Sequence, residues 1–228
     1  MTTSKKPIII SDFDGTVTDH DVIVMIMEKF APPEWVNLKD KILYKRTVTL
    51  KDGIEELFRM IPSSKKEEII SYIKEKAKIR AGFEDFISFC EKERIEFNIL
   101  SGGLDFHIYP VLDKYKDKIK IFCNKANFSG DKIRIDYEFL PKDCNLCGNC
   151  GCCKVEIVER YPREKFFRIV MGDGLADLFP SKVADLVFAR GDLIKYLEQE
   201  KVQVKWIPFN NFYEVKEQLN QKLLTMTK

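Results

Sequence analysis

The chain has 228 residues, of which 45% are hydrophobic and 32% are charged, so an intrinsically disordered chain is excluded. The length suits one domain that carries a sizeable insert, or one large and one small domain. The 38 Lys and Arg residues nearly balance the 36 Asp and Glu residues, and the formal net charge of +2 argues against a dedicated nucleic-acid-binding protein.

The sequence predicts neither a membrane span nor a secretory signal. Its longest early apolar run covers residues 8–10, whereas a span needs about 20 apolar residues and a signal at least about 7. We therefore expect a cytoplasmic protein with no membrane partner. Seven cysteines in a reducing compartment do not imply a disulfide framework.

The first 80 residues predict one strand followed by four helices. Residues 7–13 are typical of a buried strand, because a short apolar run there breaks at a charged residue. From about residue 19 to residue 80, apolar residues recur at helical spacing in four successive segments. Ser64 and Glu67 form a capping-box pattern that predicts the start of the fourth helix. Four amphipathic helices without an intervening strand predict a small helical bundle.

After residue 82 the pattern alternates between strands and helices. It predicts an α/β fold with a doubly wound, mostly parallel Rossmann-like sheet and helices on both faces. The expected domains are a core of residues 1–18 and 81–228 and a helical cap of residues 19–80, inserted after the first strand. The expected strands cover residues 97–100, 119–123, 166–171, 185–188 and 202–207, with a β-hairpin over residues 128–139.

Three predicted strands end in polar clusters. Asp12 and Asp14 follow the first strand, Ser101 begins a Ser-Gly-Gly turn, and Asp173 and Asp177 follow a later strand. In an open α/β sheet, ligands bind beyond the carboxyl ends of the strands. Carboxylates that converge there repel one another, and Mg²⁺ is the ordinary cation that offsets this repulsion. The sequence therefore predicts a magnesium site suited to phosphate chemistry.

The phosphoryl group itself also needs partners. The Ser101 hydroxyl and the backbone N–H groups around Gly102 and Gly103 are candidate donors. Lys154, just before a predicted helix, is the candidate cation.

These residues carry a family resemblance. The motifs D-x-D-G-T at residues 12–16 and G-D-G-x-x-D at residues 172–177, with a serine and a lysine between them, resemble the haloacid dehalogenase superfamily. The resemblance implies that Asp12 becomes an aspartyl-phosphate and that Asp14 is the general acid and base. It implies a small phosphorylated substrate and Mg²⁺. The implied Mg²⁺ ligands are Asp12, Asp14 through its carbonyl, Asp173 and Asp177, and the implied phosphate or substrate contacts are Thr16, Ser101, Gly102, Lys154 and Asp21.

The position of the helical insert is similar to that of the cap in the phosphoserine-phosphatase branch of this family. Such a cap closes over the site and contacts the leaving group. Phosphoserine would need an arginine for its carboxylate, but Leu57 stands about where we expect one, and Arg46 and Arg59 are possible substitutes. Two alternatives stay open: a phosphatase for phosphoserine or another small metabolite, and a non-catalytic metal-binding or redox-sensing protein.

Several other residue patterns have structural interpretations. The helical stripe of Ile23, Met27 and Phe30 is expected to be mainly bundle core, and it also offers an apolar surface to the leaving group. We expect His20 and His107 at the polar surface or at the edge of the cleft, not as metal ligands.

The cysteines fall into two groups. Cys90 and Cys123 are expected in the core. The other five share one loop, and reduced thiols, a zinc site and a disulfide or redox switch all remain open for it. They are Cys144, Cys147, Cys150, Cys152 and Cys153.

Overall fold

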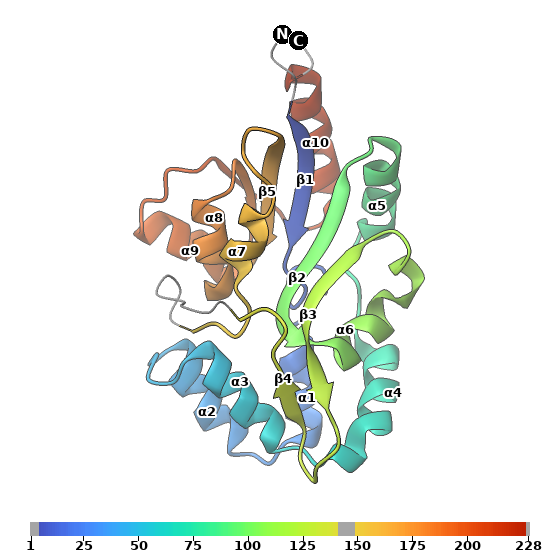
Figure 1. Ribbon diagram of the computed structural model, residues 1–228, viewed down its shortest axis with the longest axis vertical. Helices are drawn as coiled ribbons and strands as arrows, with labels where there is room; N and C mark the ends of the chain where they lie inside the picture. The colour runs from blue at the N-terminus through green and yellow to red at the C-terminus, as the bar shows by residue number, and fades with distance from the viewer. Residues whose placement is uncertain (1–4, 141–148, 227–228) are drawn as a thin grey trace.

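A computed structural model describes residues 5–140 and 149–226 of the chain. Within these residues, seven strands form one sheet in the order β4-β3-β2-β1-β5-β6-β7 (Figure 1). All neighbouring strands are parallel except β3 and β4, so the predicted doubly wound, mostly parallel sheet is confirmed. The strands are β1 (Lys6–Ser11), β2 (Glu96–Leu104), β3 (Lys120–Asn127), β4 (Arg134–Asp136), β5 (Phe166–Gly172), β6 (Leu186–Ala189) and β7 (Trp206–Pro208).

Alternate side chains of the central strands are buried on opposite faces of the sheet. In β1, Ile9 belongs to one hydrophobic cluster, whereas Ile8 and Ile10 belong to another. The first cluster includes residues of α5 (Phe83–Lys92), α6 (Asp105–Leu112) and α10 (Phe212–Met226). The second includes residues of α7 (Lys154–Glu159), α8 (Leu178–Lys182) and α9 (Gly191–Gln199). In the described ranges, no helix combines the length and the apolar character needed to cross a bilayer.

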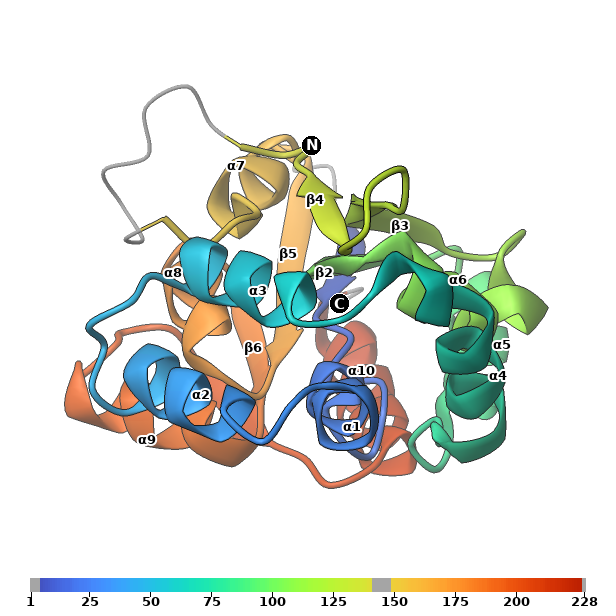
Figure 2. The ribbon, with the colours of Figure 1, turned by 90° about the horizontal axis from the view of Figure 1, so that it is seen from below.

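Of the five α-helices between β1 and β2, the first four lie beyond the carboxyl ends of the parallel strands (Figure 1). We call them the cap. Gly53 lets two of them pack closely, because a Cβ at that position would lie 2.3 Å from the side chain of Ile42. Seen from the cap end, α4 lies beside α6, away from α2 and α3 (Figure 2). The cap helices are α1 (Val22–Phe30), α2 (Trp35–Leu43), α3 (Leu50–Arg59) and α4 (Lys66–Lys76).

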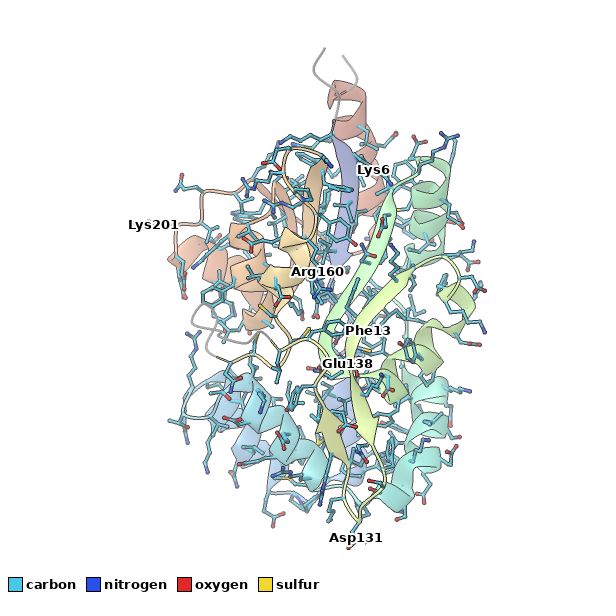
Figure 3. The ribbon with its side chains drawn as sticks, in the orientation of Figure 1. Lys6, Phe13, Asp131, Glu138, Arg160 and Lys201 are labelled. Carbon is cyan, nitrogen blue, oxygen red and sulfur yellow. The ribbon has the colours of Figure 1, made fainter. Side chains whose placement is uncertain are left out.

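The hairpin of β3 and β4 extends past the sheet to the cap. Figure 3 labels Asp131 at its tip, and the carbonyl of this residue accepts a hydrogen bond from the Ser63 N–H at 2.9 Å. The Ile133 N–H donates to the carbonyl of Ile61 at 3.2 Å, and the Lys132 ammonium donates to the carbonyl of Met60 at 2.9 Å. The link between α3 and α4 is therefore bonded to the hairpin.

This contact explains one wrong prediction. The expected capping box of Ser64 and Glu67 does not form, because residues Ser63–Lys65 make a short 3-10 turn and α4 begins at Lys66 without a side-chain cap. The strand β2 also continues to Leu104, four residues past its predicted end.

Candidate active site

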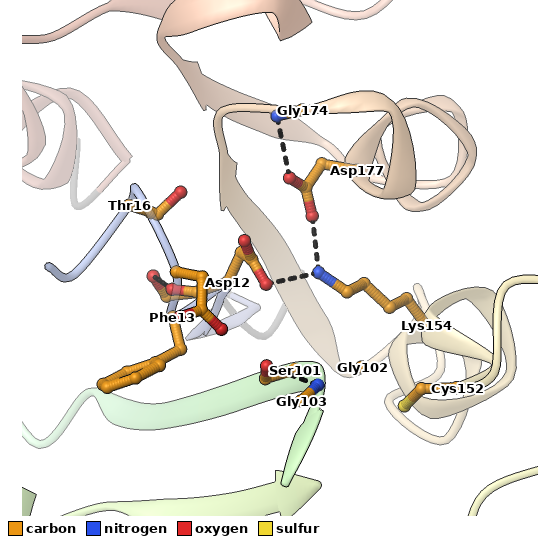
Figure 4. Close-up of polar contacts among 12 residues, drawn as sticks. Asp12, Phe13, Thr16, Ser101, Gly102, Gly103, Cys152, Lys154, Gly174 and Asp177 are labelled. Atoms are coloured by element: carbon orange, nitrogen blue, oxygen red, sulfur yellow. Dashed lines mark hydrogen bonds and ion pairs between the residues drawn. The ribbon is translucent and has the colours of Figure 1, made fainter. Parts of the chain in front are cut away.

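The first and fifth strands bring two carboxylates to one buried ammonium group. The Lys154 Nζ atom donates to Asp12 Oδ1 at 2.6 Å and to Asp177 Oδ1 at 2.8 Å (Figure 4). Lys154 is the first residue of α7, and its side chain is only 6% exposed. The second oxygen of Asp177 accepts hydrogen bonds from the backbone N–H groups of Asp173 and Gly174 at 3.1 and 3.2 Å. Asp177 thus joins the lysine to the loop after β5.

A third carboxylate completes a possible metal site. One oxygen from each of Asp12, Asp173 and Asp177 lies within 4.8 Å of the others, which fits the oxygen ligands of a hard divalent cation. Thr16, which is fully buried, donates its hydroxyl to Asp173 Oδ1 at 3.3 Å. Gly15 has φ +71°, and a Cβ there would lie 2.3 Å from Asp173 Oδ2, so this close approach requires glycine.

Burial and mutual repulsion raise the pKa values of two carboxylates in this cluster. Burial, with the charges of Asp177 and Asp173, raises the pKa of Asp12 well above its ordinary value, although Lys154 opposes the shift. Burial and the charges of Asp177 and Asp21 raise the pKa of Asp173 to about 7. The pKa of Lys154 is also raised, because its attraction to Asp12 and Asp177 outweighs the opposing effect of burial. A bound cation would relieve the repulsion among these carboxylates.

Asp14 faces the cap and an unexpected histidine. Its Oδ1 accepts a hydrogen bond from the Val22 N–H, at the start of α1, at 3.0 Å. Its Oδ2 lies 3.5 Å from Nε2 of His107, which is fully buried. The prediction that His107 lies at the surface or cleft edge is therefore wrong, because Phe58 and Phe106 enclose its ring.

The carboxyl end of β2 presents backbone and hydroxyl groups to the same site. The Ser101 Oγ atom accepts a hydrogen bond from the Gly103 N–H at 2.9 Å (Figure 4). The Asn124 side chain on β3 donates to the carbonyls of Gly102 and Gly151, each at 3.1 Å. These bonds hold the carboxyl end of β2 against the loop that precedes Lys154.

A cavity of about 410 Å³ joins these groups to the cap. One wall, which we call the floor, is polar. The opposite wall, which we call the roof, is formed by apolar cap side chains, and Asp21 lies beside them. Thr16 does not line this cavity, so its predicted contact with phosphate stays a prediction. The floor consists of Asp12, Asp14, Ser101, Gly102, Lys154, Asp173 and Asp177, and the roof consists of Ile23, Leu43, Leu50 and Ile54.

No sequence motif indicates Arg80. It is 7% exposed, and its guanidinium donates to the carbonyls of Gly15, Thr16 and Thr18 at 2.8, 2.8 and 2.6 Å. Arg190 also donates to the carbonyl of Gly15. The two arginines therefore hold the loop that carries Asp12 and Asp14, and no local motif signals this because the partners are backbone carbonyls more than 60 residues away in sequence.

Part of the cysteine loop reaches the cavity. Cys150 and Cys152 line it, and burial raises the pKa of the Cys152 thiol to about 12, which disfavours a thiolate at that position. Cys144 and Cys147 lie outside the described residues, so the zinc, thiol and redox alternatives for the loop stay open. Cys90 and Cys123 are buried, as predicted.

Comparisons with known proteins agree with this site. A family model described as haloacid dehalogenase-like hydrolase matches residues 9–178. The 2-hydroxy-3-keto-5-methylthiopentenyl-1-phosphate phosphatase of Bacillus velezensis is 42% identical over 215 residues, which cover 93% of this chain and 89% of that protein. The protein of the same name from Geobacillus thermodenitrificans is 39% identical, and the match covers 95% of this chain and 97% of that protein.

Solved structures show the same fold at lower identity. A phospho-aspartyl intermediate analogue of phosphoserine phosphatase aligns with a TM-score of 0.68 at 19% identity, over 93% of this chain and 98% of that chain. A phosphoserine phosphatase from T. onnurineus aligns with a TM-score of 0.67 at 19% identity, over 95% of this chain and 96% of that chain. Because the family model covers most of the sequence and the sequence relatives cover nearly all of it, the chain belongs to the haloacid dehalogenase-like hydrolase family.

Proposed function

We propose that this chain is a Mg²⁺-dependent phosphatase of methionine salvage. It hydrolyses 2-hydroxy-3-keto-5-methylthiopentenyl-1-phosphate to 1,2-dihydroxy-3-keto-5-methylthiopentene and inorganic phosphate. The names of the sequence relatives supply the substrate. The observation that carries the proposal is the Lys154 ammonium held between Asp12 and Asp177, in the floor of a cavity whose roof is apolar.

The reaction proceeds in two steps at phosphorus. In the first, a carboxylate oxygen of Asp12 attacks phosphorus, the bond to the leaving oxygen breaks, and Asp14 gives that oxygen a proton. In the second, Asp14 takes a proton from water, the water oxygen attacks phosphorus, and the bond to Asp12 breaks to release inorganic phosphate. The hydrogen bond from the Val22 N–H orients Asp14 for both proton transfers.

The remaining floor residues stabilise the phosphoryl group. The Lys154 ammonium, the Ser101 hydroxyl and the backbone N–H of Gly102 bind its oxygens. Mg²⁺, held by Asp12, Asp173 and the carbonyl of Asp14, would offset the repulsion between the attacking carboxylate and the phosphate dianion. Asp177 would contribute to this metal site directly or through a bound water, and its two oxygens also hold Lys154 and the loop after β5 in place.

The lining of the active-site cavity favours this substrate over phosphoserine. Among the described residues that line the cavity, Lys154 is the one with a positive charge, and two carboxylates already bind it. A phosphoserine carboxylate in the cavity would lack a cation and would lose its hydration. Arg46 lies over the ring of Tyr196 and lines an adjoining cavity, and Arg59 pairs with Glu55.

The proposal has two further parts, which concern the domain boundaries and the place where the enzyme works. We propose that residues 19–80 are a cap domain on a core of residues 1–18 and 81–228, since α1–α4 lie across the carboxyl ends of the strands. We also propose that the enzyme works in the cytoplasm on a small phosphorylated molecule, without a nucleic-acid or membrane partner.

The test is phosphate release from the methionine-salvage ester, with phosphoserine and p-nitrophenyl phosphate as comparison substrates. We expect the salvage ester to have the highest kcat/KM, and chelation of Mg²⁺ to stop turnover. Asp12→Asn removes the attacking oxygen and should lower kcat at least about a thousandfold. Asp117→Asn, at an exposed position, is the control. A variant at position 12 that keeps its activity, or that still binds fluoroberyllate as a phosphoryl analogue, would refute the mechanism.

A further inference from the structure

A second, smaller cavity lies inside the cap. Its volume is about 110 Å³, and it lies among helices α1, α2 and α3. Ile23, Leu43, Leu50 and Ile54 line both this cavity and the active-site cavity, so the two cavities adjoin along the roof of the active site, which is their shared wall. Behind the shared wall, the smaller cavity is lined by Val24, Met27, Trp35, Ile42 and Leu57. We call it the cap chamber.

The lining of the cap chamber is almost entirely apolar. Met27 is fully buried, and Trp35 and Leu57 are 8% and 6% exposed. The exceptions are Asp21, at the end shared with the active site, and Lys39, whose ammonium lies 5.5 Å from the centre of the Trp35 ring. A hydroxyl, amine or carboxylate placed deep in the chamber would lose its hydrogen bonds to water. A thioether loses little there, because sulfur packs well against methionine and aromatic side chains.

The chamber has the right size for the end of a small molecule. An apolar cavity of about 150 Å³ in another protein stays dry and admits benzene. A chamber of about 110 Å³ is therefore suited to a group of a few heavy atoms. The phosphate is fixed at Asp12 in the floor, so the group that reaches the chamber is the far end of the leaving alcohol.

We propose that the cap chamber binds the terminal alkylthio group of the leaving alcohol and so selects phosphate monoesters with a short thioether tail. The proposal rests on the proposed function of the floor. The residues of the α1 stripe are core residues or pack against the core, as expected, and the proposal narrows which of them meet the leaving group. Ile23 lies in the shared wall, and Met27 lines the chamber. Phe30 lines neither cavity, because its ring packs edge-on against Tyr72, with 5.6 Å between the two ring centres.

Binding of non-hydrolysable phosphonates tests the chamber without relying on turnover. The probes are 5-(methylthio)pentylphosphonate, 5-hydroxypentylphosphonate and methylphosphonate, titrated in the presence of Mg²⁺ by calorimetry. We expect the thioether probe to bind at least about tenfold more tightly than the hydroxyl probe. Val24→Phe, which fills the chamber from a half-buried position, should remove this preference and leave the affinity for methylphosphonate unchanged.

Met25→Phe is the matched control, because Met25 is the next residue of α1, is also half-buried and lines neither cavity. It should keep the preference. Equal affinity of the wild type for the thioether and hydroxyl probes would overturn the proposal, and so would a preference that survives in Val24→Phe.

A variant that enlarges the chamber gives the converse test. Met27→Ala should shift the preference toward 5-(propylthio)pentylphosphonate by about fivefold relative to the methylthio probe. A merely destabilised cap would weaken both probes alike, and that result would count against the chamber. If the wild type binds the probes as expected but releases no phosphate from 5-(methylthio)pentyl phosphate, the proposed function fails while the chamber stands.

Discussion

The floor and the roof of the active-site cavity are held in place by different forces. In the floor, Lys154 lies 2.6 Å from Asp12 and 2.8 Å from Asp177, and each contact is a directed bond between charged groups. In the roof, Leu50 and Ile54 are positioned by helix packing, without directed bonds. In the proposed function, the floor meets the phosphate, which all phosphate monoesters share, and the roof meets the part that differs among them. Changes in the floor should therefore affect every ester alike, whereas changes in the roof should affect esters with tails.

The largest effect in the floor is expected from Lys154→Met. This change leaves two carboxylates buried without their cation, so the free energy of unfolding should fall by about 3–5 kcal/mol near neutral pH. The kcat should fall at least about a hundredfold for esters with and without tails. Denaturant titration and phosphate release measure the two effects.

Lys195→Met is the control, because Lys195 is 69% exposed and pairs with Asp192 at the surface. Exposed pairs of this kind contribute about 1 kcal/mol or less. If Lys154→Met slowed tailed esters alone, the division between floor and roof would be wrong.

A smaller effect is expected from Arg80→Lys. A lysine keeps the positive charge but cannot reach three carbonyls with a planar fork of donors, so the loop of Asp12 and Asp14 should lose its exact placement. We expect a loss of about tenfold in kcat with little change in KM, again for all esters. Arg160→Lys, at a half-exposed position, should leave both constants unchanged. A rise in KM confined to tailed esters would place Arg80 with the roof.

The smallest effect is a pH-dependent gain in thermal stability on adding Mg²⁺. Burial and neighbouring carboxylates raise the pKa of Asp173 from 3.8 to about 7 in the folded chain. Protonated Asp173 therefore stabilises the metal-free fold in acid, and this stabilisation is lost as the pH rises through about 7. Because Mg²⁺ replaces the proton, it should raise Tm by a few degrees more at about pH 8 than at about pH 5.5.

Thermal melts with Mg²⁺ or with a chelator measure this difference. Asp173→Asn should abolish it, since the neutral amide neither titrates nor attracts the cation strongly. A larger gain at the acidic pH would contradict the assignment of Asp173 to the metal site.

Most of the floor could be predicted from the sequence because its residues lie at or just after the carboxyl ends of strands, whereas Lys154 begins a helix. Asp12, Ser101 and Asp173 each come after a short apolar run, and the carboxyl ends of parallel strands meet at one edge of the sheet. Arg80 has no such signal, since its partners are carbonyls of a segment distant in sequence. The burial of His107 could not be predicted from hydrophobic periodicity either, because it depends on a contact with Phe58 of the cap.

The roof could be predicted only in part. Helical periodicity indicates which side of α1 is buried, but not which neighbour buries it. Ile23 faces the cavity, Met27 lies deeper, and Phe30 packs on α4, although all three share one stripe. The start of α4 was also mispredicted, because a bond from the hairpin to Ser63 outweighs a local capping pattern.

Three contacts tie the cap to the core, and they differ in strength. Arg80 lies on the segment that leads from the cap back to the core, and it donates to carbonyls of the segment that leads from β1 into the cap. A rotation of the cap about these two segments would therefore also move the loop that carries Asp12. The hairpin anchors the link between α3 and α4 in the same way. The third tie joins the loop between α2 and α3 to α9. The guanidinium of Arg46 lies 5.4 Å from the centre of the Tyr196 ring, a contact that stabilises by about 0.5–1 kcal/mol at an exposed site. Such a contact is weaker than the hydrogen bonds of a charged group such as the Arg80 guanidinium, so it is the weakest of these three ties between the cap and the core.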